Sequence, residues 1–217
     1  MDIKICGLKT ADALAAALDA GASHVGFIFF PKSPRNIAPD DAGRLRQAAR
    51  GRAKAVAVTV DADDDALDGI VAAVAPDILQ LHGKETPERV AAVKARYGLP
   101  VIKAFSISTA ADLAKIPLFA DVADRLLFDA KPPAGSELPG GNGVSFDWSL
   151  LQDLDDGVDY LLSGGLNAAN VGDAIRLAGP PGIDISSGVE SAPGVKDVAL
   201  IDGFFHAVRA AEGKSRA

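Results

Sequence analysis

Short runs of apolar and β-branched residues alternate along the chain with longer, alanine-rich stretches in which apolar positions recur every three to four residues. The short runs have the length of buried strands, and the longer stretches have the spacing of amphipathic helices. The pattern predicts eight strands, at residues 3–6, 24–29, 54–60, 78–82, 101–105, 125–129, 160–163 and 183–186. It predicts helices at 11–19, 40–50, 64–75, 87–97 and 170–177, and a last helix from about 198 to 211.

Regular alternation of strand and helix implies parallel strands joined by right-handed crossovers. Eight such units close into a (βα)8 barrel, or TIM barrel, and 217 residues fall within its usual size range. An open doubly wound sheet is the alternative, but the first turn, Cys-Gly-Leu-Lys at 6–9, is not the dinucleotide fingerprint typical of that fold. We predict one barrel domain over residues 1–217, with a disordered or frayed tail from about residue 212.

Polar residues alternate with apolar ones at the ends of several predicted strands. Lys4 and Cys6 share one face of the first strand, and Asp184 and Ser186 share one face of the last, because residues two apart point the same way. The apolar residues between them must pack against the outer helices, so the polar set points into the barrel. Since the first and eighth strands are neighbours in a closed barrel, we predict that Lys4 and Asp184 pair inside it, which makes a buried charge tolerable.

Two glycine-rich turns follow the seventh and eighth predicted strands, at 163–167 (Ser-Gly-Gly-Leu-Asn) and 186–190 (Ser-Ser-Gly-Val-Glu). Barrels often bind phosphate with these two loops, because glycine lets backbone N–H groups approach an anion. The turns therefore predict a phosphate site that includes Gly164, Gly165, Ser187 and Gly188. A long loop at 130–143 contains three prolines and four glycines. Its last four residues, 140–143 (Gly-Gly-Asn-Gly), add a third candidate wall that includes Gly143. Loops of that length are often lids.

The composition and charge narrow the range of partners. Hydrophobic residues make up 48% of the chain and charged residues 24%, which is an ordinary globular balance. The formal net charge of −7 makes nucleic acid and anionic membrane poor partners, so an anionic substrate needs local basic groups. The single cysteine allows no internal disulfide, and the sequence shows no signal peptide and no run of about 18 apolar residues. We therefore expect a cytoplasmic protein.

Histidine is the residue type that would most readily indicate a metal centre. His24, His82 and His206 fall at a predicted strand start, a strand end and a late helix, respectively. These positions do not converge on one ion, so the sequence predicts no metal site.

Several motifs resemble those of the phosphoribosylanthranilate isomerases, in family order and from residue 2 to about 200. The segment 4–8 (Lys-Ile-Cys-Gly-Leu) resembles the N-terminal signature of that family. The other matching segments are 26–29 (Gly-Phe-Ile-Phe) with 33–35 (Ser-Pro-Arg), 79–83 (Leu-Gln-Leu-His-Gly), 140–143 (Gly-Gly-Asn-Gly) with 146–148 (Phe-Asp-Trp), 164–166 (Gly-Gly-Leu), and 187–190 (Ser-Gly-Val-Glu) with 193–194 (Pro-Gly) and 196–197 (Lys-Asp).

The resemblance implies an activity in tryptophan biosynthesis and a set of site residues. The expected reaction is the Amadori rearrangement of N-(5-phosphoribosyl)anthranilate to 1-(2-carboxyphenylamino)-1-deoxyribulose 5-phosphate, with no metal or organic cofactor. The family's general base maps onto Cys6, its general acid onto Asp129, and its contact to the anthranilate carboxylate onto Arg35. Members of the family are monomers or homodimers. His82, at the mouth of the barrel, is a further candidate for substrate binding.

The chemistry is consistent with this pair of residues. An acid must protonate the ring oxygen as the furanose opens, and a base must then remove the C2 proton of the resulting iminium. With a reference pKa near ~4, Asp129 needs burial or a suitable neighbour to hold a proton. Cys6, with a reference pKa near ~8.5, is a thiolate only in a minority of molecules at pH 7, and we expect Lys4 to raise that fraction.

Other interpretations of the same residues stand beside this one. A lone cysteine at a strand end is usually a small buried hydrophobe, an aspartate there is often a helix cap, and Arg35 also fits a solvated loop charge. The histidine-pathway ribonucleotide isomerase performs the same rearrangement, typically with two carboxylates, and Cys6 argues against it. Pentose-phosphate epimerases need metal ligands that this sequence does not assemble. A non-catalytic phosphate-binding barrel is the alternative from another class.

Overall fold

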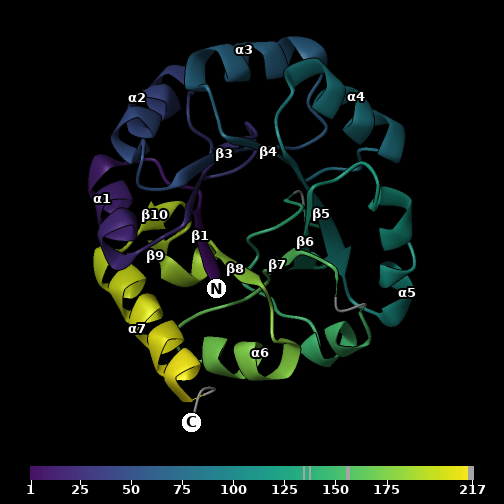
Figure 1. The fold of residues 1–217 in the computed structure, drawn as a ribbon. Coiled ribbons are helices and arrows are strands. Elements are labelled where there is room, and N and C mark those ends of the chain that lie inside the picture. The colour runs from purple at the N-terminus through teal and green to yellow at the C-terminus, as the bar shows by residue number, and fades with distance from the viewer. Residues whose placement is uncertain (134, 137, 155–156, 215–217) are drawn as a thin grey trace.

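The computed structural model describes residues 1–133, 135–136, 138–154 and 157–214. Its centre is a closed barrel of eight parallel strands in sequence order, β1 to β8, as predicted (Figure 1). Each predicted strand is present, with ends that differ by no more than two residues. The strands are β1 (Asp2–Cys6), β2 (His24–Phe29), β3 (Lys54–Thr59), β4 (Ile78–Leu81), β5 (Val101–Ile107), β6 (Arg125–Ala130), β7 (Tyr160–Leu162) and β8 (Gly182–Ile185).

Helices form an outer ring around the strands (Figure 1). The six predicted helices are present as α1 (Ala11–Ala20), α2 (Pro39–Ala49), α3 (Asp64–Val74), α4 (Pro87–Tyr97), α6 (Val171–Ala178) and α7 (Val198–Lys214). Four short helices and a hairpin of two strands were not predicted, because segments of two to six residues carry too little periodicity. They are α5 (Ala110–Leu113), η1 (Ile116–Phe119), η2 (Trp148–Asp153), and β9 (Glu190–Ala192) with β10 (Val195–Lys196), beside the three-residue η3 (Ser187–Val189).

Local sequence determines where several helices begin and end. The side chain of Thr10 accepts a hydrogen bond from a first-turn N–H of α1, and Asp63 does the same for α3. Thr86 caps α4, whose first residue is proline. Gly21 and Gly98 end α1 and α4 in the left-handed conformation, which glycine adopts without steric cost.

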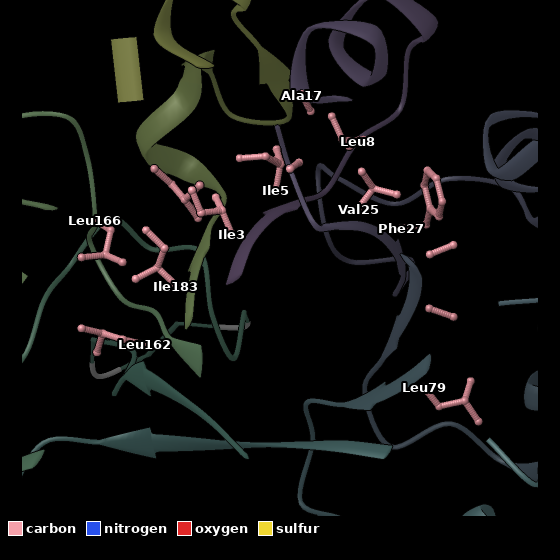
Figure 2. Packing of buried hydrophobic residues seen from close by; sticks show 14 of the residues in the cluster. Ile3, Ile5, Leu8, Ala17, Val25, Phe27, Leu79, Leu162, Leu166 and Ile183 are labelled. Carbon is pink, nitrogen blue, oxygen red and sulfur yellow. The ribbon is translucent and has the colours of Figure 1, made fainter. Parts of the chain in front are cut away.

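Two separate apolar clusters flank the barrel wall. The larger one lies between strands and helices, and Figure 2 shows part of it, including Ile3 and Ile5 of β1, Leu79 of β4 and Ile183 of β8. The smaller one contains the alternate residues of the strands and lies inside the barrel. Its members are Cys6, Val56, Val58, Ile78, Ile102, Ala104, Leu127 and Leu161. The predicted division of strand faces is therefore confirmed.

A buried ion pair joins the first and last strands inside the barrel. Lys4 and Asp184 are register partners across β1 and β8, and Lys4 Nζ lies 2.8 Å from Asp184 Oδ1. Both residues are almost fully buried. The predicted pairing is confirmed.

The chain terminus differs from the expected tail. Helix α7 continues to Lys214, so residues 212–214, which we predicted to be frayed, are helical, and residues 215–217 lie outside the described part of the chain. Among the described residues, no helix is both long and apolar enough to cross a membrane.

Candidate active site

A cavity, partly open to solvent, lies at the carboxyl-terminal ends of the strands. Cys6, Arg35, His82 and Asp129 all line it. This is the end of a parallel barrel at which active sites occur. The structure thus brings together the four side chains that the sequence indicated, from β1, the loop after β2, the exit of β4 and the end of β6.

Cys6 ends β1 with its side chain at the floor of the cavity. A Cβ at Gly26, the register partner of Cys6 on β2, would lie 3.0 Å from Cys6 Sγ and 3.1 Å from Lys4 Nζ. The absence of a side chain at Gly26 therefore leaves room for both the thiol and the ammonium group.

Burial raises the pKa of the Cys6 thiol above its ordinary value, because the thiolate loses its hydration. The charge and hydrogen bond of Lys4 act in the opposite direction, and the charge of Asp184 adds to the increase. Lys4 lowers the pKa of Cys6, as expected, but the effect of burial is larger and the net pKa is raised. The neutral thiol is therefore the dominant form of Cys6 at pH 7.

Asp129 and His82 face one another across the cavity wall. Asp129 is buried near the end of β6, and its Oδ1 accepts a hydrogen bond from the N–H of Ala130. The other carboxylate oxygen, Oδ2, lies 3.4 Å from His82 Nε2. His82 Nδ1 lies 3.0 Å from Nε2 of Gln80, which shares its strand face, so one ring nitrogen faces each partner. We predicted His82 as a substrate contact, and the structure shows that it also contacts Asp129.

Gly140, which follows β6, packs against this pair. A Cβ on Gly140 would lie 2.3 Å from Asp129 Oδ2 and 2.9 Å from His82 Nε2. A side chain at this position would collide with the carboxylate unless Asp129 or the loop moved. The glycine-rich motif at 140–143 is thus explained in part by the close approach of its backbone to Asp129.

Arg35 lies almost fully buried at the cavity wall. Its Nε donates to Glu190 Oε1 and its Nη2 to Glu190 Oε2, each at 2.8 Å. The arginine is therefore a fixed group of the site and not a solvated loop charge. Glu190 begins β9, the strand that the sequence did not predict.

The two glycine-rich turns meet beside the cavity. Gly164, Gly165 and Ser187 line it, and both glycines have positive φ, +89° and +62°. Gly188 packs so closely on the turn after β7 that an added Cβ would lie 1.9 Å from the carbonyl oxygen of Leu166. The predicted turns are therefore adjacent in space, as a shared phosphate site requires.

Two predicted contacts lie outside the wall of the cavity. Neither Gly143 nor Gly188 is among the described residues that line it. Substrate contact by these two residues stays a prediction. Among the described residues, no group of three or more His, Cys, Asp or Glu side chains is arranged to hold a metal ion.

Comparison with known proteins decides the family. A family model described as N-(5'phosphoribosyl)anthranilate (PRA) isomerase matches residues 3–207. The chain belongs to this isomerase family. The N-(5'-phosphoribosyl)anthranilate isomerase of Mesorhizobium japonicum is 74% identical over 211 residues, which cover 97% of this chain and 96% of the relative.

Solved structures of PRA isomerases share the fold. The enzyme from Thermotoga maritima superposes with a TM-score of 0.86 at 34% identity, and the match covers 98% of this chain and 99% of that one. A second structure, with a TM-score of 0.84 at 32% identity, covers 97% of this chain and 99% of that one. That second protein is in complex with reduced 1-(o-carboxyphenylamino)-1-deoxyribulose 5-phosphate.

Sequence reasoning missed some PRA isomerase residues that the structure places at the site. Glu190, Gly140 and Gly141 all lie in the motifs that carried the family resemblance, but none of their contacts with Arg35, His82 or Asp129 was predicted. Their contacts are to residues far away in the chain: Glu190 contacts Arg35 at a separation of 155 positions. The motif spacing gave no signal of this pairing, because it depends on how the barrel closes.

Proposed function

We propose that this PRA isomerase rearranges N-(5'-phosphoribosyl)anthranilate to 1-(2-carboxyphenylamino)-1-deoxyribulose 5-phosphate with Asp129 as general acid and Cys6 as general base. The observation that carries the assignment is that a buried carboxyl group and a buried thiol line one cavity from strands that are not neighbours, β6 and β1. This arrangement places one proton donor and one proton acceptor on different sides of a substrate.

Ring opening is the first step. Asp129 gives its proton to the furanose oxygen while the bond between that oxygen and C1 breaks, and the lone pair of the anthranilate nitrogen forms the iminium. Burial of Asp129 and the His82 ring 3.4 Å away support the role, because the carboxyl group is shielded from water and held in place. A positioned acid of this kind accelerates such a step by roughly 10²–10⁴-fold.

Proton removal from C2 is the second step. The Cys6 thiolate takes this proton, and the electrons of the C–H bond form a C1–C2 double bond as the iminium nitrogen regains its lone pair. The resulting enol gains a proton at C1 and loses one from its 2-hydroxyl group, which gives the ketone product. Exchange with solvent returns Cys6 to the thiolate and Asp129 to the acid.

The two anionic ends of the substrate need separate positive groups, since the chain as a whole carries a net charge of −7. We assign Arg35 to the anthranilate carboxylate, because its guanidinium is fixed at the cavity wall. We assign the phosphate to the turns that contain Gly164, Gly165 and Ser187. These residues line the cavity, and glycine lets backbone N–H groups approach an anion closely.

The setting of this reaction follows from the same chemistry. The substrate is a small phosphorylated sugar that carries an aryl amine. We expect the reaction to need no nucleic acid, no membrane surface, no metal and no organic cofactor. We expect the enzyme to work in the cytoplasm as a monomer or a homodimer.

The test is an activity assay on freshly generated N-(5'-phosphoribosyl)anthranilate, followed by the loss of anthranilate-type fluorescence. We expect turnover by the wild type and a loss of at least about a hundredfold in kcat for Cys6→Ser and for Asp129→Asn, because a hydroxyl is a far weaker base and an amide is no acid. Circular dichroism and thermal unfolding of both variants provide the control for folding.

Two outcomes would contradict the proposal. Near-normal turnover by either variant would remove that residue from its role. If the wild type binds phosphate ligands but does not convert the substrate, the chain is a phosphate-binding barrel with a degenerate site.

A further inference from the structure

The hairpin that follows β8 has no part in the reaction steps above. Its strands β9 and β10 carry Glu190 and Lys196, and its turn contains Gly194. The hairpin touches the segment that carries Arg35, because a Cβ on Gly194 would lie 2.4 Å from the carbonyl oxygen of Pro34. The hairpin therefore packs against the backbone that immediately precedes Arg35.

Both carboxylate oxygens of Glu190 accept hydrogen bonds from the guanidinium of Arg35. The two hydrogen bonds, Nε to Oε1 and Nη2 to Oε2, are 2.8 Å each, and both side chains are about 5% exposed or less. A bidentate pair of this kind fixes the plane of the guanidinium as well as its position.

Glu190 is itself held by the hairpin. Lys196 Nζ donates to Glu190 Oε1 at 2.6 Å, and the N–H of Gly194 donates to Oε2 at 3.1 Å. Lys196 Nζ also donates to the carbonyl and hydroxyl oxygens of Ser186, at the exit of β8. The carboxylate thus receives hydrogen bonds on both oxygens, and these outweigh its burial and lower the pKa of Glu190.

Two glycines leave the space in which Arg35 lies. A Cβ on Gly7 would lie 2.8 Å from Arg35 Cδ, and a Cβ on Gly141 would lie 2.5 Å from Arg35 Nη1. Both glycines have positive φ, +78° and +71°. Arg35 Nη2 also donates to the carbonyl oxygen of Gly141 at 3.2 Å. The side chain is therefore enclosed from three directions by Gly7, Gly141 and Glu190.

The hydrogen bonds leave one edge of the guanidinium for a ligand. Arginine has five N–H donors, and those of Nε and Nη2 bond to Glu190 and Gly141 within the described structure. The two N–H groups of Nη1 have no hydrogen-bond partner among the described residues, and Arg35 lines the cavity. Nη1 is therefore the nitrogen that is left to bind a ligand.

We propose that Glu190, held by Lys196, is a positioning residue that aims Arg35 at the aryl carboxylate, and that the β9–β10 hairpin is therefore a specificity element for carboxylated substrates. The inference rests on the proposed function, in which Arg35 binds that carboxylate. Arg35, Lys196 and Glu190 together carry one net positive charge, which the substrate carboxylate neutralises.

The main experiment compares two ligands that differ only in the carboxylate: N-(5'-phosphoribosyl)anthranilate and N-(5'-phosphoribosyl)aniline, the latter as substrate or competitive inhibitor. We expect Glu190→Gln to raise KM for the first by about tenfold or more, equivalent to one well-aimed charge-assisted hydrogen bond. We expect the kcat of Glu190→Gln to stay within about threefold of the wild-type value. The KM or Ki of the aniline compound should stay within about twofold, because the substitution weakens only the binding of the carboxylate, equally in the ground state and the transition state. Arg35→Met provides the reference for complete loss of the contact.

A matched control separates positioning from loss of a buried charge. Glu85 is a carboxylate of equal burial, 3% exposed, that pairs with Lys103 Nζ at 2.8 Å, and it does not line the cavity. We expect Glu85→Gln to lower stability without changing the ratio of KM values between the two ligands. If Glu85→Gln changes that ratio as much as Glu190→Gln does, the effect is not specific to the hairpin and the inference fails.

A second pair of variants keeps the inference testable if Glu190→Gln does not fold. Gly141→Ala and Gly135→Ala impose the same strain in one loop, at φ +71° and +83°, but only the Cβ at 141 meets Arg35, while that at 135 meets no described atom within 4 Å. We expect the ratio of KM values to shift in Gly141→Ala and not in Gly135→Ala.

The outcomes separate the two proposals. An unchanged KM in Glu190→Gln, or an equal rise for both ligands, overturns the role of Glu190 while wild-type turnover upholds the proposed function. If Arg35→Met also leaves the ratio unchanged, Arg35 does not bind the carboxylate and the inference fails with that assignment. If the wild type does not convert the carboxylated substrate, the proposed function fails, and with it the inference.

Discussion

Lys4 Nζ lies 2.8 Å from Asp184 Oδ1 in the interior of the barrel, and this ion pair bridges the strands that close it. Cys6 is two residues further along β1, on the same face as Lys4. The charges of Lys4 and Asp184 therefore both act on the pKa of the Cys6 thiol. One interaction therefore contributes to the stability of the fold and to the chemistry of the site, and its two partners have opposite effects on Cys6.

Removal of one partner should cost considerable stability. We expect Asp184→Leu to lower the free energy of unfolding by about 3–5 kcal/mol, because it leaves the Lys4 charge buried without a partner. Urea denaturation measures the change. The exposed pair of Arg52 with Asp19 is the control, and Asp19→Leu should change stability far less, since solvent-exposed pairs contribute little. Equal effects of the two substitutions would contradict the structural role of the interior pair.

The raised pKa of Cys6 predicts a rate that increases with pH. Because burial favours the neutral thiol, each unit of pH below the pKa lowers the thiolate fraction by about tenfold, so kcat/KM should rise from neutral toward alkaline pH. Lys4→Met should move this rise to higher pH, because the charge and hydrogen bond of Lys4 lower the pKa. Asp184→Asn should move it to lower pH, because the charge of Asp184 raises the pKa.

Alkylation of Cys6 by iodoacetamide as a function of pH provides an independent measurement on the only cysteine of the chain. The alkylation profile should shift with the rate profile in both variants. A rate profile that is flat between pH 6 and 9 while alkylation rises with pH would exclude the thiolate as the base.

His82 should affect the acid step without carrying it. We expect His82→Ala to lower kcat by roughly tenfold, less than the loss in Asp129→Asn, because Asp129 keeps its hydrogen bond from Ala130 but loses the ring 3.4 Å away. Gln80→Leu removes the partner of the other ring nitrogen and should produce a weaker form of the same change. An unchanged kcat in His82→Ala would leave only packing as its role.

His24 should make stability depend on pH at the opposite end of the barrel. Burial lowers the pKa of His24 below 6.5, the value expected in the unfolded chain. As pH falls through 6.5 toward the lower folded-state pKa, the unfolded chain binds a proton that the folded chain does not, so this contribution to stability is lost. The loss of unfolding free energy between pH 7 and 5.5 should therefore be smaller in His24→Asn than in the wild type. Identical pH dependence of the two proteins would contradict the buried neutral state.

Local sequence was sufficient for most of the fold. The period of the apolar positions gave all eight strands and the six longer helices, because each of those elements buries one face and repeats it along its own length. The short helices α5 and η2 and the β9–β10 hairpin were missed, because they are too short for a period to develop. What holds the hairpin in place is contact with distant residues, as at Gly194 and Pro34.

The candidate site likewise has a part that the sequence predicted and a part that only the tertiary structure decided. Sequence alone determined which residues stand at strand ends, and so it indicated Cys6, Asp129 and the two glycine-rich turns. Tertiary structure alone decided that Glu190 orients Arg35, that His82 faces Asp129, and that burial of Cys6 outweighs the help of Lys4. The physical reason is that hydrogen bonds and desolvation depend on distances between groups, and only closure of the barrel brings groups such as Lys4 and Asp184, 180 positions apart, into contact.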